Sequence, residues 1–187
     1  METKSKEIVT VQFNSDISRD NTEIRIAFYA NIGFFIEISQ MLEFNLRKLI
    51  CYYKSVTEIE ATEITKENVE KTCKSYDEYY DKTYKDKYTL GKLTKELRKV
   101  QVIDSKILDK FDEINNYRIQ VVHMIFQNNI VVEKLKDSKY VLEYNQNRLI
   151  PMINITDVTN MFVIQMINTY KESLREYKTQ VGIATQD

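Results

Sequence analysis

Residues 20–53, DNTEIRIAFYANIGFFIEISQMLEFNLRKLICYY, carry the longest regular pattern in the chain. Apolar side chains recur there at intervals of three, four and seven residues, which places them on one face of an α-helix. The members of this stripe are Phe28, Phe35, Met41 or Leu42, Leu46, Leu49 and Tyr53. Asp20 and Glu23, three residues apart, resemble a capping box at the start of a helix. The pattern therefore predicts one long amphipathic helix at the centre of a helical bundle.

The composition supports the same fold class. The 187 residues include only 3 glycines and 1 proline. Because the tight turns of sandwiches and barrels depend on these residues, all-β folds are nearly excluded. A glycine-rich loop for phosphate is likewise nearly excluded, because the chain has so few glycines. With 43% hydrophobic residues, residues 1–187 are long enough to form one domain with a core of its own.

Further helical patterns follow the first one. Residues 54–65, rich in Thr and Glu, are predicted to be a connection. The predicted helices after it span residues 67–80, 89–102, about 105–131, one or two segments between 139 and 149, and about 156–170. Asp104 or Ser105 is expected to cap the helix 105–131, and Thr156 or Asp157 the last helix. Pro151 is expected to end the helical segment before the last one. Residues 1–19 differ, since a weak alternation there predicts an extended arm. The sequence thus predicts an all-α bundle of five or six helices with a short extended N-terminal arm.

Few side chains in the chain can carry catalysis. The two cysteines, Cys51 and Cys73, lie 22 positions apart, and the chain has one histidine, so a zinc site is not expected. The net charge of −1 offers no overall basic field for nucleic acid. No signal peptide is visible, and the most apolar run is interrupted by Glu37. We therefore expect a cytoplasmic protein without metal, cofactor or membrane contact.

The single histidine lies in the predicted helix 105–131. A polar band there consists of Asn116, Gln120, His123 and Gln127. Arg118 stands where the apolar stripe calls for an apolar residue. An imidazole can accept or donate a proton near neutral pH, and a guanidinium can hold phosphate oxygens in two places. Arg118 and His123 are about 140° apart on an ideal helix, so their convergence needs a long reach, a distorted helix or two protomers. The alternative is an ordinary surface histidine beside an interhelical ion pair of Arg118.

Residues 76–88 are dense in Tyr, Asp and Lys. One interpretation is a solvated helix end and loop. The other is a surface for RNA, on which bases stack on tyrosine rings.

The segment from Arg118 to His123 (an arginine, four residues and a histidine) resembles the motif of the HEPN superfamily, higher eukaryotes and prokaryotes nucleotide-binding. Tyr117 and Val122 are typical neighbours in that motif, and the long first helix also fits the family's bundle. The resemblance implies that Arg118 and His123 are the catalytic pair in a cleft between two protomers. The sequence departs from the family pattern at Ile119, where a polar residue is usual, and at Ile125, where one subgroup carries a tyrosine.

The function implied by this resemblance is that of a metal-independent endoribonuclease, acting as a toxin or an anti-phage defence effector. RNA is the expected substrate, with Asn116 and Gln120 positioning it. The expected protein partners are a second copy of the chain and an antitoxin or other regulator. The alternatives are a non-catalytic module of HEPN type that binds RNA or nucleotide, and a helical protein-interaction module.

Overall fold

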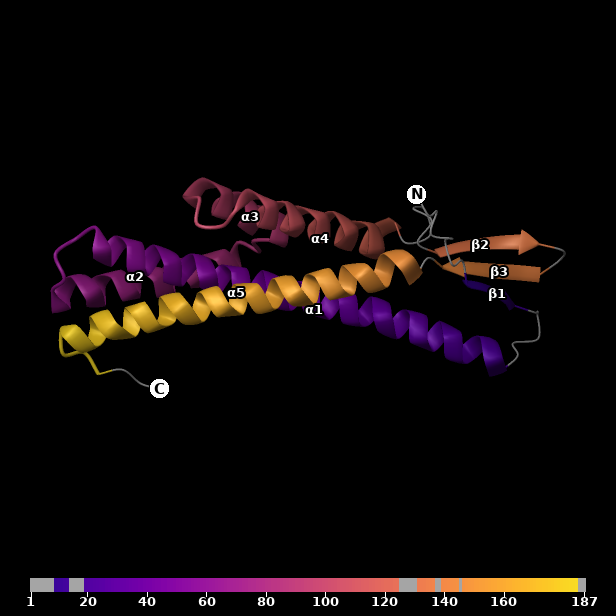
Figure 1. Cartoon of the computed structure of the whole chain (residues 1–187), viewed down its shortest axis with the longest axis horizontal. Coiled ribbons are helices and arrows are strands. Elements are labelled where there is room, and N and C mark those ends of the chain that lie inside the picture. The colour runs from indigo at the N-terminus through magenta and orange to yellow at the C-terminus, as the bar shows by residue number, and fades with distance from the viewer. Residues whose placement is uncertain (1–8, 14–18, 125–130, 137–138, 145, 185–187) are drawn as a thin grey trace, which may run out of the picture. The chain divides into compact units, whose positions relative to one another are not determined.

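Five helices make up most of the part of the chain that the structure describes, and the predicted all-α fold is confirmed (Figure 1). The structure, a computed structural model, describes residues 9–13, 19–124, 131–136, 139–144 and 146–184. In chain order the elements are β1 (Val9–Phe13), α1 (Arg19–Glu60), α2 (Lys66–Lys85), α3 (Leu90–Val100), α4 (Ser105–Met124), β2 (Val131–Lys136), β3 (Lys139–Tyr144) and α5 (Gln146–Gln180). A small sheet accompanies the helices.

Helix α1 is longer than the sequence pattern predicted. It extends to Glu60 through half of the segment 54–65, so the predicted connection is wrong there. Val56 and Ile59 continue the apolar stripe and are 4% and 1% exposed. The Thr57 hydroxyl, which could have competed with helical hydrogen bonds, donates to the Tyr53 carbonyl at 2.9 Å. Burial of the stripe therefore outweighs the weak helix propensity of the threonines.

The predicted helix between residues 139 and 149 is wrong, because residues 139–144 form the central strand of an antiparallel sheet. The strand order is β1-β3-β2, and Tyr144 pairs with Val9 on one side and Val131 on the other. The extended N-terminal segment is confirmed for residues 9–13, which form β1. β-Branched and aromatic residues such as Val131, Val132 and Tyr140 favour strands. Val131, near which the helix beginning at about residue 105 was expected to end, is the first residue of β2, and helix α4 spans Ser105–Met124.

Helix α5 runs through Pro151, where the sequence predicted that a helical segment ends. A proline within a helix removes one backbone hydrogen bond and costs about 3 kcal/mol. Leu149, Met152 and Ile153 around it are buried, and their burial offsets that cost. Thr156, expected as the cap of a separate last helix, instead lies inside α5 and donates to the Met152 carbonyl at 2.7 Å.

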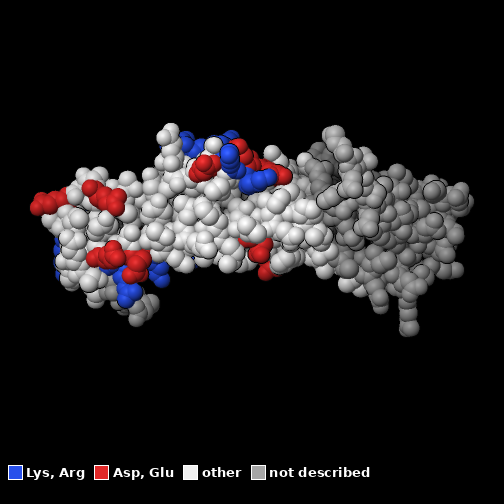
Figure 2. Space-filling model, in the orientation of Figure 1, with Lys and Arg blue, Asp and Glu red and all other residues white. Residues whose placement is uncertain are grey.

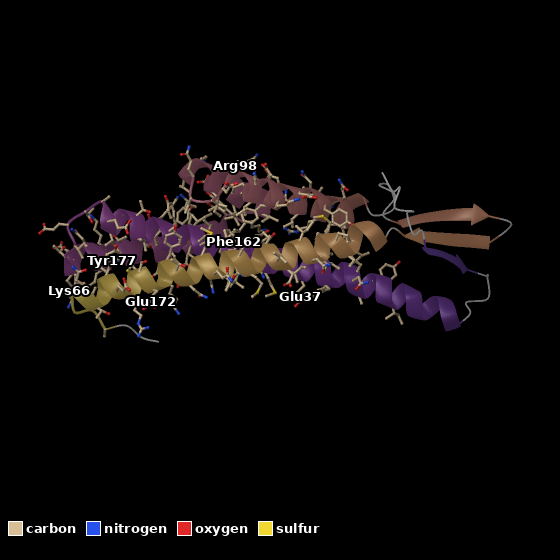
Figure 3. The ribbon with its side chains drawn as sticks, viewed as in Figure 1. Glu37, Lys66, Arg98, Phe162, Glu172 and Tyr177 are labelled. Carbon is tan, nitrogen blue, oxygen red and sulfur yellow. The ribbon has the colours of Figure 1, made fainter. Side chains whose placement is uncertain are left out.

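The chain divides into two compact units, each assembled from two stretches of sequence. The unit of Gln40–Phe111 and Val158–Asp187 has a core of Val56, Ile59, Val69 and Leu174. Tyr177 on α5 packs against this core, and its hydroxyl donates to Glu60 Oε1 at 2.9 Å (Figure 3). The last turns of α5 are therefore held to the end of α1.

The other unit comprises Met1–Ser39 and Asp112–Asp157. Phe35 of α1 is fully buried there, and its ring meets the ring of Tyr117 of α4 edge to face, with centroids 5.2 Å apart. Ile114 of α4 is also fully buried. This packing fixes which face of α4 points away from α1.

Helix α5 also has an unusual distribution of charge. Between Arg148 and Lys171 its only charged residue is Asp157, and in Figure 2 the surface over the middle of α5 is free of charged side chains. An 18-residue window within Leu149–Gln180 has a mean hydropathy of 1.2, and 39% of that window is buried. By length and composition alone, α5 is long and apolar enough to cross a membrane, a test that a buried bundle helix also passes. Asn160, Val163 and Ile167 are buried, so α5 serves as a bundle helix.

Candidate functional site

The candidate catalytic residues all lie on α4, whose start and orientation are well defined. The Asp104 carboxylate accepts a hydrogen bond from the backbone N–H of Lys106 at 2.7 Å, so Asp104 caps the helix, one of the two caps predicted. The side chains that α4 buries follow one stripe. They are Leu108, Phe111, Ile114, Tyr117 and Val121, each no more than 3% exposed. The buried stripe sets the direction in which every other α4 side chain points.

Arg118 does not occupy the buried position that the sequence pattern assigned to it. Tyr117, 3% exposed, takes that position, and Arg118 is half-buried at the edge of the stripe. Both residues are spaced suitably from Ile114, at i+3 and i+4, so periodicity alone could not choose between them. Arg118 therefore lies at the edge of the buried stripe and not inside it.

The predicted polar band is confirmed as an outward-facing set within the described residues. Asn116 and His123 are exposed and Gln120 is half-buried. Asn116 and His123 lie seven residues apart, and so about 20° apart around the helix. They point away from the buried Ile114. Gln127, the fourth member of the predicted band, lies outside the described residues.

Around the axis of α4, two apolar side chains lie between those of Arg118 and His123. At about 100° per residue, the order around the helix is Arg118, Val122, Ile119, His123. Val122 is 48% exposed and Ile119 is 45% exposed. We call these four residues the Arg118–His123 face. Within one chain the guanidinium and the imidazole stand at its two edges, about 140° apart, and do not share a side of the helix.

The tyrosine-rich segment 76–88 matches neither of its two interpretations fully. Helix α2 continues to Lys85, so most of the segment is helical. Lys54 Nζ lies 4.4 Å from the centroid of the Tyr79 ring, and Lys92 Nζ lies 3.5 Å from that of Tyr88. These two rings are already covered by lysines, and Arg47 Cζ lies 5.9 Å from the centroid of the Tyr84 ring, which is 67% exposed. A base could stack without displacing a lysine only at positions such as Tyr84.

Burial changes the acid–base behaviour of several groups between α1 and α2. It raises the pKa of the Cys51 thiol from 9.0 to about 12, with Lys54 opposing the shift. Burial likewise raises the pKa of the Tyr79 hydroxyl to about 12. No group of three or more His, Cys, Asp or Glu side chains in the described residues could hold a metal ion.

We expect the folded protein to lose stability as the pH rises above about 9. The Cys51 thiol keeps its proton in the folded state to a higher pH than in the unfolded state, so its contribution is complete below pH 9 and is lost toward pH 12. Urea unfolding of Cys51→Ala between pH 8 and pH 11 should show a shallower decline than that of the wild type. The control Ser55→Ala, at a neighbouring buried position, should keep the steep decline. Equal slopes for Cys51→Ala and the wild type would contradict the assignment.

Comparison with known proteins gives no match from which a function could be transferred, so the proposal of a function depends on the geometry of the site. No family model matches the chain, and no curated protein or solved structure matches it either.

Proposed function

We propose that the chain is a metal-independent endoribonuclease of HEPN type that cleaves RNA where the α4 helices of two copies meet. The observation that carries this proposal is the Arg118–His123 face, in which a cationic side chain and the chain's only imidazole flank two exposed apolar residues. Its polar edges suit a phosphodiester, and its apolar centre suits a second copy of the same face.

The exposed apolar centre supports the dimer. Ile119 and Val122 would each bury apolar surface against the partner, at roughly 25 cal/mol per Å² removed from water. A two-fold axis through this face brings two guanidiniums and two imidazoles to one interface. The dimer also gives Ile119 a role, since the position that is usually polar in the family would here contact the partner.

The chemistry needs two proton-transfer groups and one cation. The RNA 2′-oxygen attacks the phosphorus and loses its proton to one His123 imidazole, which acts as the base. The bond from phosphorus to the 5′-oxygen breaks, and the leaving oxygen takes a proton from the second imidazole, that of the partner's His123. Arg118 stabilises the negative charge that develops on the phosphoryl oxygens. The products are a 2′,3′-cyclic phosphate and a 5′-hydroxyl.

Asn116 and Gln120 lie next to His123 around α4 and are proposed to position the RNA by hydrogen bonds. In the cell we propose that this activity is cytoplasmic and serves as a toxin or as an effector of anti-phage defence. An antitoxin or another regulatory protein would hold it in check.

A second candidate function is a helical protein-interaction module. It is favoured by the large exposed apolar side chains on α1 and α5: Ile26 is 63% exposed, Phe34 47%, Val158 69% and Met161 54%. The first two of these residues belong to one compact unit and the last two to the other, so each unit has large apolar side chains that a protein partner could bury. On this account the protein would bind its partner without cleaving RNA.

The ends of the cleavage products test the chemistry. We expect the purified wild-type protein to cut single-stranded RNA in the presence of EDTA, leaving 2′,3′-cyclic phosphate and 5′-hydroxyl ends. End-labelled RNA, analysed with and without phosphatase and kinase treatment, identifies these ends. Cleavage that requires Mg²⁺, or that leaves 3′-hydroxyl and 5′-phosphate ends, would contradict the proposed mechanism.

A further inference from the structure

A cavity lies between α1, α2 and α5 in the unit of Gln40–Phe111 and Val158–Asp187. Its volume is about 290 Å³, at the lower end of the range for small-molecule sites. Tyr52, Tyr76 and Tyr80 contribute aromatic rings to its lining, and Lys48 and Lys178 contribute ammonium groups. No residue of the Arg118–His123 face lines it. The cavity therefore needs an explanation separate from the proposed cleavage of RNA.

The lining also includes one hydroxyl group of a serine. Ser55 is 2% exposed and lines the cavity. A hydroxyl can donate one hydrogen bond and accept two, so Ser55 adds a polar contact to a lining made mostly of aromatic and charged side chains.

The charged side chains of the lining favour an anion. They are Lys48, Lys178 and Asp77, and among the described residues none of the three forms an ion pair. Burial raises the pKa of both thiols in the lining, Cys51 and Cys73, so both are neutral at physiological pH. The lining thus carries two positive charges and one negative charge.

We propose that this cavity binds a small flat aromatic molecule that carries one acidic group. The aromatic ring packs against the rings of Tyr52 and Tyr80, which supply favourable stacking or edge-to-face contacts. The acidic group accepts hydrogen bonds from Lys48 and Lys178, and the Ser55 hydroxyl completes the polar contacts. An aromatic carboxylic acid and a nucleoside monophosphate share this chemistry.

The chain provides its own reporter of occupancy, because its only two cysteines both line the cavity. The reporter is Cys73, which is half-buried, because Cys51 is buried and too weakly ionised to react at a useful rate. Its alkylation by the neutral reagent N-ethylmaleimide is followed by mass spectrometry on the full chain. The probes are indole-3-acetate, adenosine 5′-monophosphate, neutral indole and inorganic phosphate. We expect at least one of the two aromatic acids at saturation to slow alkylation about tenfold or more, and the neutral ring and phosphate to leave the rate unchanged. The acid that protects identifies the source of the ligand.

The lysines are tested by isothermal titration with the protecting acid. Lys48→Gln and Lys178→Gln should each raise the Kd about tenfold. The control Lys171→Gln removes an exposed lysine from the same helix as Lys178 but outside the cavity, and should leave the Kd unchanged. The proposal is overturned if neither acid protects the Cys73 thiol, if phosphate or indole protects as well as the acids, or if Lys171→Gln weakens binding as much as Lys178→Gln. RNA cleavage is not the readout, so the outcome is independent of the proposed function.

Discussion

Replacing Arg47 with leucine is expected to lower the free energy of unfolding by about 3–5 kcal/mol. Arg47 is 8% exposed, and its Nη2 donates to Glu43 Oε1 at 2.7 Å and to the Tyr88 carbonyl. The other carboxylate oxygen of Glu43 accepts from the backbone N–H of Leu90 at 3.1 Å, where α3 begins. Without the guanidinium, the largely buried Glu43 carboxylate would lose its cationic donor and the Tyr88 carbonyl would lose the hydrogen bond from Arg47. The loss is large because the remaining charge stays buried.

Urea unfolding followed by circular dichroism measures this loss. The control is Arg98→Leu, because Arg98 forms a similar ion pair with Asp109 at 2.8 Å, with side chains 37% and 68% exposed. Exposed ion pairs contribute at most about 1 kcal/mol, so this control should remain close to the wild type. Equal losses for the two leucine variants would show that the buried network around Arg47 does not stabilise the bundle.

Replacing Arg118 with glutamine is expected to lower the rate of RNA cleavage by about 10²–10³-fold. The proposed role of the guanidinium is to stabilise charge on the phosphoryl oxygens in the transition state, so the effect should fall mainly on kcat. Single-turnover cleavage at saturating protein isolates this step. Arg175→Gln serves as a matched control, because it removes an exposed arginine from α5 that forms an ion pair with Glu172 of the same helix. A variant that raises KM while leaving kcat unchanged would limit Arg118 to binding RNA.

Much of the fold could be predicted because apolar periodicity and burial agree. The stripe Phe35, Leu42, Leu46 and Leu49, predicted from spacing alone, is fully buried in α1. The stripe of α4 is equally regular up to Val121. Where many apolar side chains repeat at helical intervals, tertiary packing reinforces the local preference and the prediction holds.

The errors lie where tertiary contacts outweigh local signals. Pro151 ordinarily ends a helix, but the buried Leu149 and Met152 beside it keep α5 continuous. The segment 139–144 was predicted to be helical because a short apolar run fits either period. It is a strand because it pairs with β2, which precedes it directly in the chain, and with β1, more than 120 positions away in sequence. The pairing with β1 leaves no local trace in the sequence.

The candidate site was predictable in part. The polar band of Asn116 and His123 is visible in the sequence because polar residues recur at helical spacing. The exposure of Ile119 and Val122 was not predictable, since apolar residues on a bundle helix are ordinarily buried. The cavity was missed altogether, because Cys51 and Cys73 come from different helices and nothing in the sequence brings them together.

The central claim, that the imidazole of His123 performs proton transfer in RNA cleavage, is tested most directly by one comparison. Wild-type protein and His123→Ala are incubated with the same single-stranded RNA in EDTA, at equal concentration and with circular dichroism to verify folding. The account predicts that the variant, though folded, loses about 10²–10⁴-fold in cleavage rate. Equal cleavage by the two proteins would contradict it.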